Sequence, residues 1–479
     1  MQTRKDLLQA HRLMTRRAAL ALLQAEPDPP DQPLRRLNVG AFSSVLVAGI
    51  VAAVFGIWGL VAPGHAGGLT APDSLLVDQA TGTPYVPCQH GKLCPVVNYA
   101  SARLALNTTT PNQRSVSQAS LARYPRGPQI GIAGLPPLPA PGMLVGQPWS
   151  VCVQTEYSQA TLASRTVTTL VGGQRVGGRP MSRDDALVVA AGGEDWLVWN
   201  GERMLIPPAQ QRAILTALGF VQAAEQVPLS WLDAFSQGPD FAPPAIPGFG
   251  RPVAHGPAGS PARIGQVFVT SPGAAQYYVL TRQGLAPVTS TEAKLLDAAT
   301  GQVAQGTVTT AQAANHHGSL SADGMPLSMP VPADRNVSPR APLCVVYSGP
   351  ASTGPLAGQV TVGGRVPAGG LATGHGTYVD RIAMRPGTAA LAAVIPALPP
   401  APPASPNPVV AAPSGQRPDV TSYFLVTGGV RYGLASPGVA AVLGYDLARE
   451  QTLVPASVVD LIPQGPALDP AAARGRVSG

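Results

Sequence analysis

The sequence predicts an α+β protein with one N-terminal transmembrane helix, followed by an elongated exported body of four β-β-α repeat units around a central β-rich domain. Three observations predict this fold: an uncharged apolar run near the N-terminus, four segments that share one pattern of strand, turn and helix signals, and four cysteines that all follow the apolar run. The 479 residues are too many for one compact core, so several sub-domains are expected.

The apolar run covers residues 39–62 and contains no charged side chain. At about 1.5 Å per residue, a helix of this length crosses a hydrocarbon core of roughly 30 Å with some tilt. A cleavable signal peptide would instead have an apolar region of roughly 7–15 residues directly behind a short basic start. Because 38 residues precede this run, we expect a retained membrane anchor.

Residues 1–38 form a basic segment in which leucines are interleaved with arginine and lysine, a pattern typical of an amphipathic helix. Few positive residues follow the span before Lys92, so the positive-inside rule predicts a cytoplasmic N-terminus and a periplasmic or extracellular C-terminal body. The residues alone leave open whether the basic segment lies on the anionic face of the bilayer or docks on a cytoplasmic partner.

All four cysteines lie in the exported region, where an even number is typical of disulfide bonds. We expect Cys88 to pair with Cys94, because the two flank Gly91 in a predicted hairpin and directly opposed strand residues approach closely enough for a disulfide. This pairing leaves Cys152 with Cys344, both in apolar runs that predict strands. The spacing does not suit a zinc site, and no metal is expected.

Four segments repeat one pattern. Each starts with an aromatic and β-branched run, passes a turn glycine into a second apolar run, and ends in an alanine- and leucine-rich stretch. This order predicts two strands joined by a tight turn and followed by a helix. A valine, 24 to 26 residues after each glycine, starts a segment that predicts a second, short helix. The turn glycines are Gly91, Gly201, Gly284 and Gly429.

The repeats are unevenly spaced, and strand-rich stretches separate the first from the second and the third from the fourth. These stretches are expected to form one central domain, joined by the bond between Cys152 and Cys344. The predicted regions are a basic cytoplasmic segment (1–38), a transmembrane helix (39–62), repeat unit 1 (70–135), the first segment of the central domain (143–192), repeat unit 2 (193–241), repeat unit 3 (262–320), the second segment of the central domain (340–398), a proline-rich linker (399–418), repeat unit 4 (419–470) and a disordered tail (471–479).

The chain resembles EccB, a membrane component of actinobacterial type VII (ESX) secretion systems. The stretches that carry the resemblance are TRKDLLQAHRLMTRRAALAL from residue 3, SLLVDQATGTPYVP from residue 74, VVNYASARLALN from residue 96 and YFLVTGGVRYGLASPGVAAVLGY from residue 423. The resemblance implies a protein of the cytoplasmic membrane that associates with other copies of itself and with EccC, EccD and EccE subunits. EccC is the motor ATPase of that complex, and EccB supplies the periplasmic portion.

The resemblance also implies that the central-domain disulfide of the family falls on Cys152 and Cys344. Cys88 and Cys94 are an addition to the family pattern, so their pairing depends on the hairpin argument. For the basic N-terminal segment, the resemblance favours docking on a partner subunit.

The sequence contains no phosphate-binding loop, although EccB proteins are often labelled ATPases. A P-loop needs the pattern GxxxxGK[ST], and the nearest string, residues 172–179, lacks both the lysine and the Ser/Thr. We expect this string to be a loop between strands. Neither the pair His316–His317 nor the pair Asp184–Asp185 predicts a metal or catalytic site, because no further ligands lie near them in the sequence.

The leading hypothesis is therefore a structural, self-associating component of a type VII secretion complex, anchored in the bilayer and without a cofactor. The net charge of +7 is spread too thinly for nucleic-acid binding. A membrane-anchored ATPase of the same system and a cell-wall binding protein are the alternatives. An aromatic content of only 5% argues against the latter, because sugar binding usually needs exposed aromatic rings.

Overall fold

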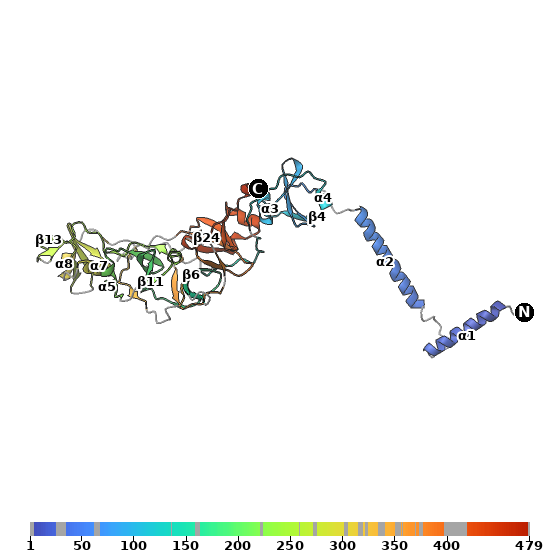
Figure 1. Cartoon of the computed structure of the whole chain (residues 1–479), viewed down its shortest axis with the longest axis horizontal. Helices are drawn as coiled ribbons and strands as arrows, with labels where there is room; N and C mark the ends of the chain where they lie inside the picture. The colour runs from blue at the N-terminus through green and yellow to red at the C-terminus, as the bar shows by residue number, and fades with distance from the viewer. Residues whose placement is uncertain are drawn as a thin grey trace. The chain divides into compact units, whose positions relative to one another are not determined.

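The computed structural model forms two units, Met1–Leu69 and Thr70–Gly479 (Figure 1). The second unit is called the C-terminal body below. The structure describes residues 4–24, 35–61, 68–135, 137–158, 163–220, 224–257, 259–271, 275–300, 305–314, 320, 324–333, 341–349, 356, 358–368, 370–372, 377–396 and 419–477.

The N-terminal unit contains two helices, α1 (Arg4–Gln24) and α2 (Arg35–Val61), drawn in blue in Figure 1. The stretch Val39–Ile57 of α2 is long and apolar enough to cross a membrane, and none of it is buried. A helix suits this task because it satisfies its own backbone hydrogen bonds, which lipid cannot do. The apolar side chains of α1, Leu7 and Met14 among them, are exposed too, in keeping with the amphipathic pattern.

Four sheets of the C-terminal body share one topology. In each, three consecutive strands pair antiparallel, and a fourth strand joins the free side of the first in parallel orientation. A parallel partner needs a crossover connection, and a helix provides it between the third and fourth strands. A short helix then follows the fourth strand. We call these sheets with their helices repeat units 1 to 4.

The strands are β1 (Ser74–Asp78), β2 (Pro84–Cys88), β3 (Lys92–Pro95) and β4 (Asn112–Val116) in unit 1; β8 (Asp185–Ala191), β9 (Glu194–Trp199), β10 (Glu202–Ile206) and β11 (Glu225–Gln226) in unit 2; β15 (Val267–Thr270), β16 (Tyr277–Thr281), β17 (Gly284–Val288) and β18 (Gly306–Val308) in unit 3; and β24 (Ala390–Ile395), β25 (Ser422–Thr427), β26 (Val430–Gly433) and β27 (Gln451–Pro455) in unit 4. The crossover helices are α3 (Tyr99–Leu106), α5 (Gln211–Leu218), α7 (Ser290–Thr300) and α9 (Gly438–Leu443). The short helices are α4 (Gln118–Leu121), α6 (Leu229–Leu232), α8 (Thr310–Ala313) and α11 (Ala456–Val459). Unit 4 also has α10 (Leu447–Glu450), before β27.

The repeat unit is thus larger than the expected β-β-α pattern, because it gains its first and fourth strands. As a result, repeat units 2 and 4 each begin earlier in the sequence than expected. The strands β8 and β24, which fall within the predicted central segments 143–192 and 340–398, pair instead with β9 and β25 of units 2 and 4. An apolar run shows that a strand is buried, but it does not say which sheet the strand joins.

The central sheet has the order β22-β23-β6-β5-β20-β21-β7. It unites the two stretches of chain that flank repeat units 2 and 3, because β5 pairs antiparallel with β20. Its strands are β5 (Trp149–Ser158), β6 (Ala163–Gly172), β7 (Arg179–Pro180), β20 (Leu343–Tyr347), β21 (Gln359–Val362), β22 (Leu371–Ala372) and β23 (Arg381–Ala383). Smaller strands are β12 (Ser236–Gln237), β13 (Pro252–Val253), β14 (Ala262–Arg263) and β19 (Val331–Pro332).

The proline-rich stretch 399–418 lies outside the described residues, but its flanks show that it does not connect two domains. Val394 at the end of β24 pairs with Ser422 at the start of β25. The chain therefore leaves and re-enters the same sheet, and the stretch is an insertion within repeat unit 4. The equivalent connection in unit 2 runs only from Ala191 to Glu194.

The expectation of a disordered tail at 471–479 is wrong for the described residues up to 477. Residues Pro470–Ala473 form α12, which starts at the N-cap Asp469 with a proline in the first turn, a strong helix-start signal. Ala473 is fully buried, and α12 packs against α3 of repeat unit 1. The N–H of Val477 then donates to the carbonyl of Gln129 at 3.2 Å.

Candidate functional site at the junction of the central sheet and two repeat units

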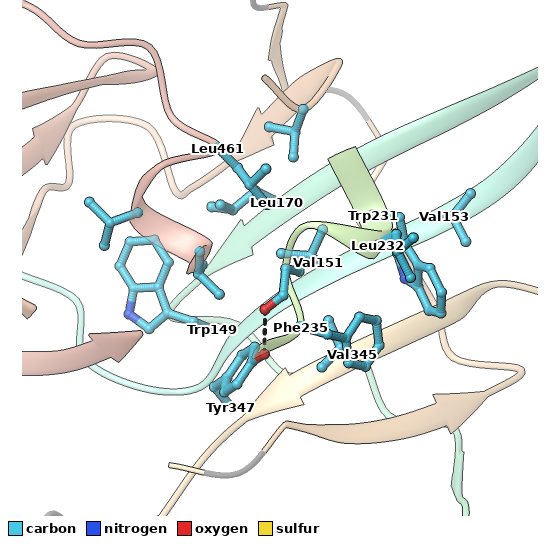
Figure 2. Close-up of a cluster of buried hydrophobic side chains, with 14 of the residues drawn as sticks. Trp149, Val151, Val153, Leu170, Trp231, Leu232, Phe235, Val345, Tyr347 and Leu461 are labelled. Carbon is cyan, nitrogen blue, oxygen red and sulfur yellow. Dashed lines mark hydrogen bonds between the residues drawn. The ribbon is translucent and has the colours of Figure 1, made fainter. Parts of the chain in front are cut away.

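One face of the central sheet shares a hydrophobic core with the short helices of repeat units 2 and 4 (Figure 2). Both helices are too short to be stable alone, so this packing holds them in place. The sheet contributes apolar side chains from β5, β6 and β20, and the chain around α6 and α11 covers them. The fully or almost fully buried members include Trp149, Val151, Leu170, Val345, Trp231, Leu232, Phe235, Val458 and Leu461.

A single backbone carbonyl, that of Ala234, links these three elements. It accepts hydrogen bonds from Tyr347 Oη of β20 at 2.6 Å, drawn as the dashed line in Figure 2, and from Ser457 Oγ of α11 at 2.8 Å. Burial raises the pKa of Tyr347 far above its ordinary value, because the phenolate would lose its hydration. The hydroxyl therefore stays protonated and donates. An unpaired carbonyl at this depth would be costly, so the junction favours this arrangement of units 2 and 4.

In repeat units 2 and 4, an arginine of the hairpin pairs with an aspartate at the end of the short helix. In repeat unit 2, the guanidinium of Arg203 on β10 lies 5.4 Å from the ring centre of Trp196 and pairs with Asp233, directly after α6. The planar guanidinium suits such combined stacking and ion pairing. The corresponding residues of repeat unit 4 are Arg431, Phe424 and Asp460.

The crossover helices join the repeat units in pairs. Helix α3 of unit 1 packs against α9 of unit 4, and α5 of unit 2 packs against α7 of unit 3. In the first pair, Arg103 Nε donates to the carbonyl of Val442 at 2.8 Å. The buried apolar residues of each pair form a shared core. The body is therefore two pairs of repeat units, and the short helices of units 2 and 4 pack together on one face of the central sheet.

The disulfide between Cys152 and Cys344 lies on the opposite face of the central sheet, where it packs with Val171 and Ala383. The two cysteines are directly opposed on β5 and β20, with their Cα atoms 4.0 Å apart. This bond joins the two chain segments that make up the sheet.

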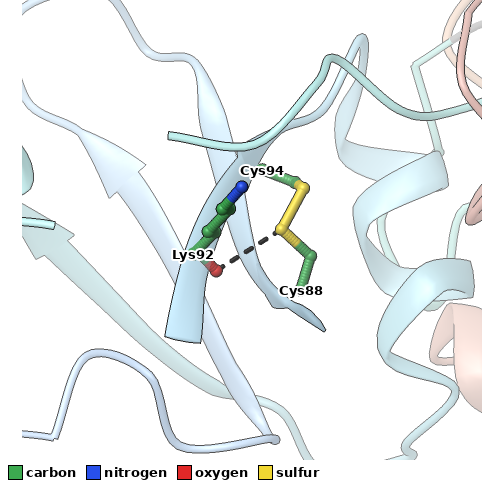
Figure 3. The surroundings of a disulfide bond; sticks show 3 residues. All are labelled: Cys88, Lys92 and Cys94. Carbon is green, nitrogen blue, oxygen red and sulfur yellow. Dashed lines mark hydrogen bonds between the residues drawn. A yellow bond between two sulfur atoms is a disulfide. The ribbon is translucent and has the colours of Figure 1, made fainter. Parts of the chain in front are cut away.

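Cys88 and Cys94 are also bonded (Figure 3), but they are not directly opposed as the hairpin argument assumed. Cys88 faces Lys92, and Cys94 faces Val86. The three-residue turn Gln89–Gly91 sets this register, so the bond joins diagonal neighbours on one face of the hairpin, with Cα atoms 5.9 Å apart.

Three of the predicted turn glycines lie in hairpin turns with positive φ, which favours glycine. They are Gly91 (φ 67°), Gly201 (φ 80°) and Gly429 (φ 76°). Gly284 also has a positive φ (122°), but it lies one position beyond its turn, because it is the first residue of β17 and pairs with Thr281. The turns of units 2 and 4 also approach the chain of the central domain: a Cβ at Gly201 would come within 2.9 Å of the Gly358 carbonyl oxygen.

The described residues contain no group of three or more His, Cys, Asp or Glu side chains that could hold a metal. The glycine-rich string 172–179 connects β6 to β7, and a Cβ at Gly178 would come within 3.0 Å of the backbone nitrogen of Gly364. Glycine at position 178 thus permits close backbone packing. Asp185 begins β8 and accepts from the Ser182 N–H at 2.8 Å. The pair His316–His317 lies outside the described residues.

The arrangement defines a class of protein: a chain with a membrane-spanning type of helix and a body of paired β-rich repeat units, built around structural junctions. A family model described as "Type VII secretion system ESX-1, transport TM domain B" matches residues 1–478. The chain belongs to this family, EccB.

Curated relatives agree with this family. The ESX-5 secretion system ATPase EccB5 of Mycobacterium tuberculosis is 30% identical over 60% of this chain, and the match spans only 57% of that relative's length. The ESX-1 secretion system ATPase EccB1 of Mycolicibacterium smegmatis is 29% identical over 98% of this chain and 94% of its own length.

Solved structures are similar as well. A chain in an intact ESX-5 inner membrane complex is 25% identical, with a TM-score of 0.58 over 100% of this chain and 96% of that one. The EccB3 dimer from the ESX-3 core complex is 24% identical, with a TM-score of 0.59 over 84% of this chain and 100% of that one, and it supports the fold alone.

Proposed function

We propose that this chain is a structural component of a type VII secretion complex in the inner membrane, where it scaffolds the periplasmic side by associating with other copies of itself. The observation that supports this most directly is the three-way junction at Ala234. The buried side-chain hydrogen bonds Tyr347–Ala234 and Ser230–Thr168 both hold repeat unit 2 to the central sheet. The similarity to a chain of an ESX-5 inner membrane complex along the whole length supports the same role.

The proposed orientation places the N-terminus in the cytoplasm and the C-terminal body in the periplasm. The arginines before the span support it through the positive-inside rule, and two disulfides in the body suit an oxidising compartment. The exposed helix α1 would then contact cytoplasmic regions of the complex, with EccC, EccD and EccE subunits as the expected partners.

We also propose that the chain itself hydrolyses no ATP. The names of its relatives contain the word ATPase, but the sequence lacks a P-loop, and Gly178 of its nearest string packs against the backbone of Gly364. A motor activity in the complex would then belong to the EccC-type subunit.

The test is purification of the tagged full-length chain from its own membranes in mild detergent, with mass spectrometry of the proteins that co-purify. Recovery of EccC-, EccD- and EccE-type subunits in a large complex is the expected result. A matched ATPase assay would compare this complex with one that carries a substituted P-loop lysine in its EccC subunit, and we expect the activity to disappear. Isolation of the chain as a lone monomer, or activity that survives the substitution, would contradict the proposal.

A further inference from the structure

Repeat unit 1 carries a cleft of about 490 Å³ between the start of α3, the edge strand β4 and the loop from β1 to β2. This size lies within the range of small-molecule sites, roughly 300–1,000 Å³. The residues around it are Val77, Thr81, Gly82, Thr83, Pro84, Val96, Val97, Asn98, Tyr99, Gln113 and Gln129.

None of these lining residues is charged. The polar ones carry hydroxyl or amide groups, which can both donate and accept hydrogen bonds. A charged ligand would find no countercharge here, and a purely apolar ligand would leave these groups unpaired. The lining therefore suits a neutral ligand with many hydroxyl groups.

The cleft also contains an aromatic ring, that of Tyr99, which is 39% exposed. Its hydroxyl bonds to Gln113 Oε1 at 3.0 Å and so ties the ring at the start of α3 to β4. The amide nitrogen of Gln113 remains as a donor. Of the four crossover helices, only α3 begins with an aromatic residue, so this feature distinguishes unit 1 from the other repeat units.

The walls of the cleft are fixed by hydrogen bonds to neighbouring groups. In the loop from β1 to β2, Thr81 Oγ1 donates to the buried Asp78 at 2.9 Å. At the start of α3, Asn98 caps the helix by accepting from the Ser101 N–H at 2.7 Å, and its amide donates to the Ile132 carbonyl at 2.8 Å. Little side-chain ordering is then needed when a ligand binds, which favours affinity.

We propose that this cleft binds a neutral glycan chain. A sugar ring presents an apolar C–H face, which would pack on the ring of Tyr99, and hydroxyl groups, which would bond to the amides of Gln113 and Gln129 and to the hydroxyls of Thr81 and Thr83. Tyrosine suits this task because it has an apolar body and a polar end. The inference is independent of the proposed role in secretion and would stand without it.

The experiment is calorimetric titration of the full-length chain with two neutral probes, chitohexaose and a galactan hexasaccharide. The chain is held in lipid nanodiscs, because the sugar headgroups of maltoside detergents would compete for the site. We expect saturable binding of one probe. Tyr99→Ala should raise its Kd about tenfold and Gln113→Ala about fivefold, whereas Tyr99→Phe, which keeps the ring, should raise it less than Tyr99→Ala.

The matched control is Tyr157→Ala, which removes a 57% exposed tyrosine from β5, outside the cleft, and should leave the Kd unchanged. Equal melting temperatures of all variants would confirm that each is folded. The inference is overturned if neither probe binds, if Tyr157→Ala weakens binding as much as Tyr99→Ala, or if a charged peptide binds in a Tyr99-dependent manner while both glycans do not.

Discussion

The two pairs of repeat units are built from sheets of the same topology, but the units of each pair are separated by very different lengths of chain. Units 2 and 3 follow each other in sequence, and α5 packs on α7. Units 1 and 4 lie at opposite ends of the body's sequence, and α3 packs on both α9 and α12. Units 2 and 3 can pair as soon as their residues are synthesised, whereas the pair of units 1 and 4 also includes α12, which is synthesised after all four units. Non-local contacts of this kind slow folding, so the pair of units 1 and 4 is expected to form last.

The central disulfide should have the largest effect, because it joins two distant segments of the chain, β5 and β20, within the central sheet. It closes a separation of 192 residues. Replacing both Cys152 and Cys344 by serine should therefore lower the free energy of unfolding by about 5 kcal/mol in the chain-entropy model. Replacing Cys88 and Cys94, which are only 6 apart, should lower it by about 2 kcal/mol. Urea unfolding of the full-length chain measures both, and equal losses would refute the loop-length explanation.

Truncation of the shared cores tests whether the pairs are separate. Leu104 of α3 and Leu295 of α7 are both buried, each in the core of a different pair. Alanine at either position should cost about 3 kcal/mol in stability. Hydrogen exchange should then rise in α9 for Leu104→Ala and in α5 for Leu295→Ala. If either variant loosened both pairs equally, the body would be one cooperative unit.

The C-terminal helix offers a smaller and more local test of the non-local pair. Arg474 Nε donates to the carbonyl of Ala105 at 2.8 Å, so Arg474→Ala should destabilise the contact of units 1 and 4 by about 2 kcal/mol. The control is Arg449→Ala, whose ion pair with Asp446 is exposed and should contribute less than about 0.5 kcal/mol. Thermal melting compares the two, and similar shifts would mean that α12 is not needed to join the pair.

The smallest effect should depend on pH and be confined to repeat unit 2. Burial raises the pKa of Glu202 to about 7, so the folded chain binds this proton more tightly than the unfolded chain does. Stability should then fall as the pH rises from about 4.5 to about 7, by about 1–2 kcal/mol after allowance for solvent screening. Glu202→Gln should flatten this range of the pH profile of the melting temperature, while Glu194→Gln, exposed on β9, should not.

Features encoded within a few residues could be predicted from the sequence, such as the apolar helix, the hairpins at Gly201 and Gly429, and the short helices. The expected side-chain caps are present at α4 and α8, whereas α6 and α11 follow a proline and have none. Turn glycines and hydrophobic periodicity determine local structure, so they can be recognised without knowledge of the fold. The pairing of Cys152 with Cys344 followed from elimination and from the family pattern rather than from geometry.

Features that depend on distant partners could not be predicted. The alanine-rich β24 has no strand signature of its own and is a strand because β25 and β27 flank it. Helix α12 was missed because its four residues are stabilised by α3, more than 360 positions earlier. The start of α12 did carry a local signal, the N-cap Asp469 followed by Pro470. The junction at Ala234 involves a backbone carbonyl, which carries no signal in a sequence.

The paired ends of the proline-rich insertion in unit 4 make its length nearly independent of the rest of the molecule. Because Val394 and Ser422 face each other in the sheet, added or removed residues change only the entropy of closing a loop, about 0.6 kcal/mol for each doubling. Residues can therefore be added or removed here while β24 and β25 stay paired. For the same reason, an epitope tag or a fluorescent domain inserted between β24 and β25 would report on the assembled protein without displacing repeat unit 4.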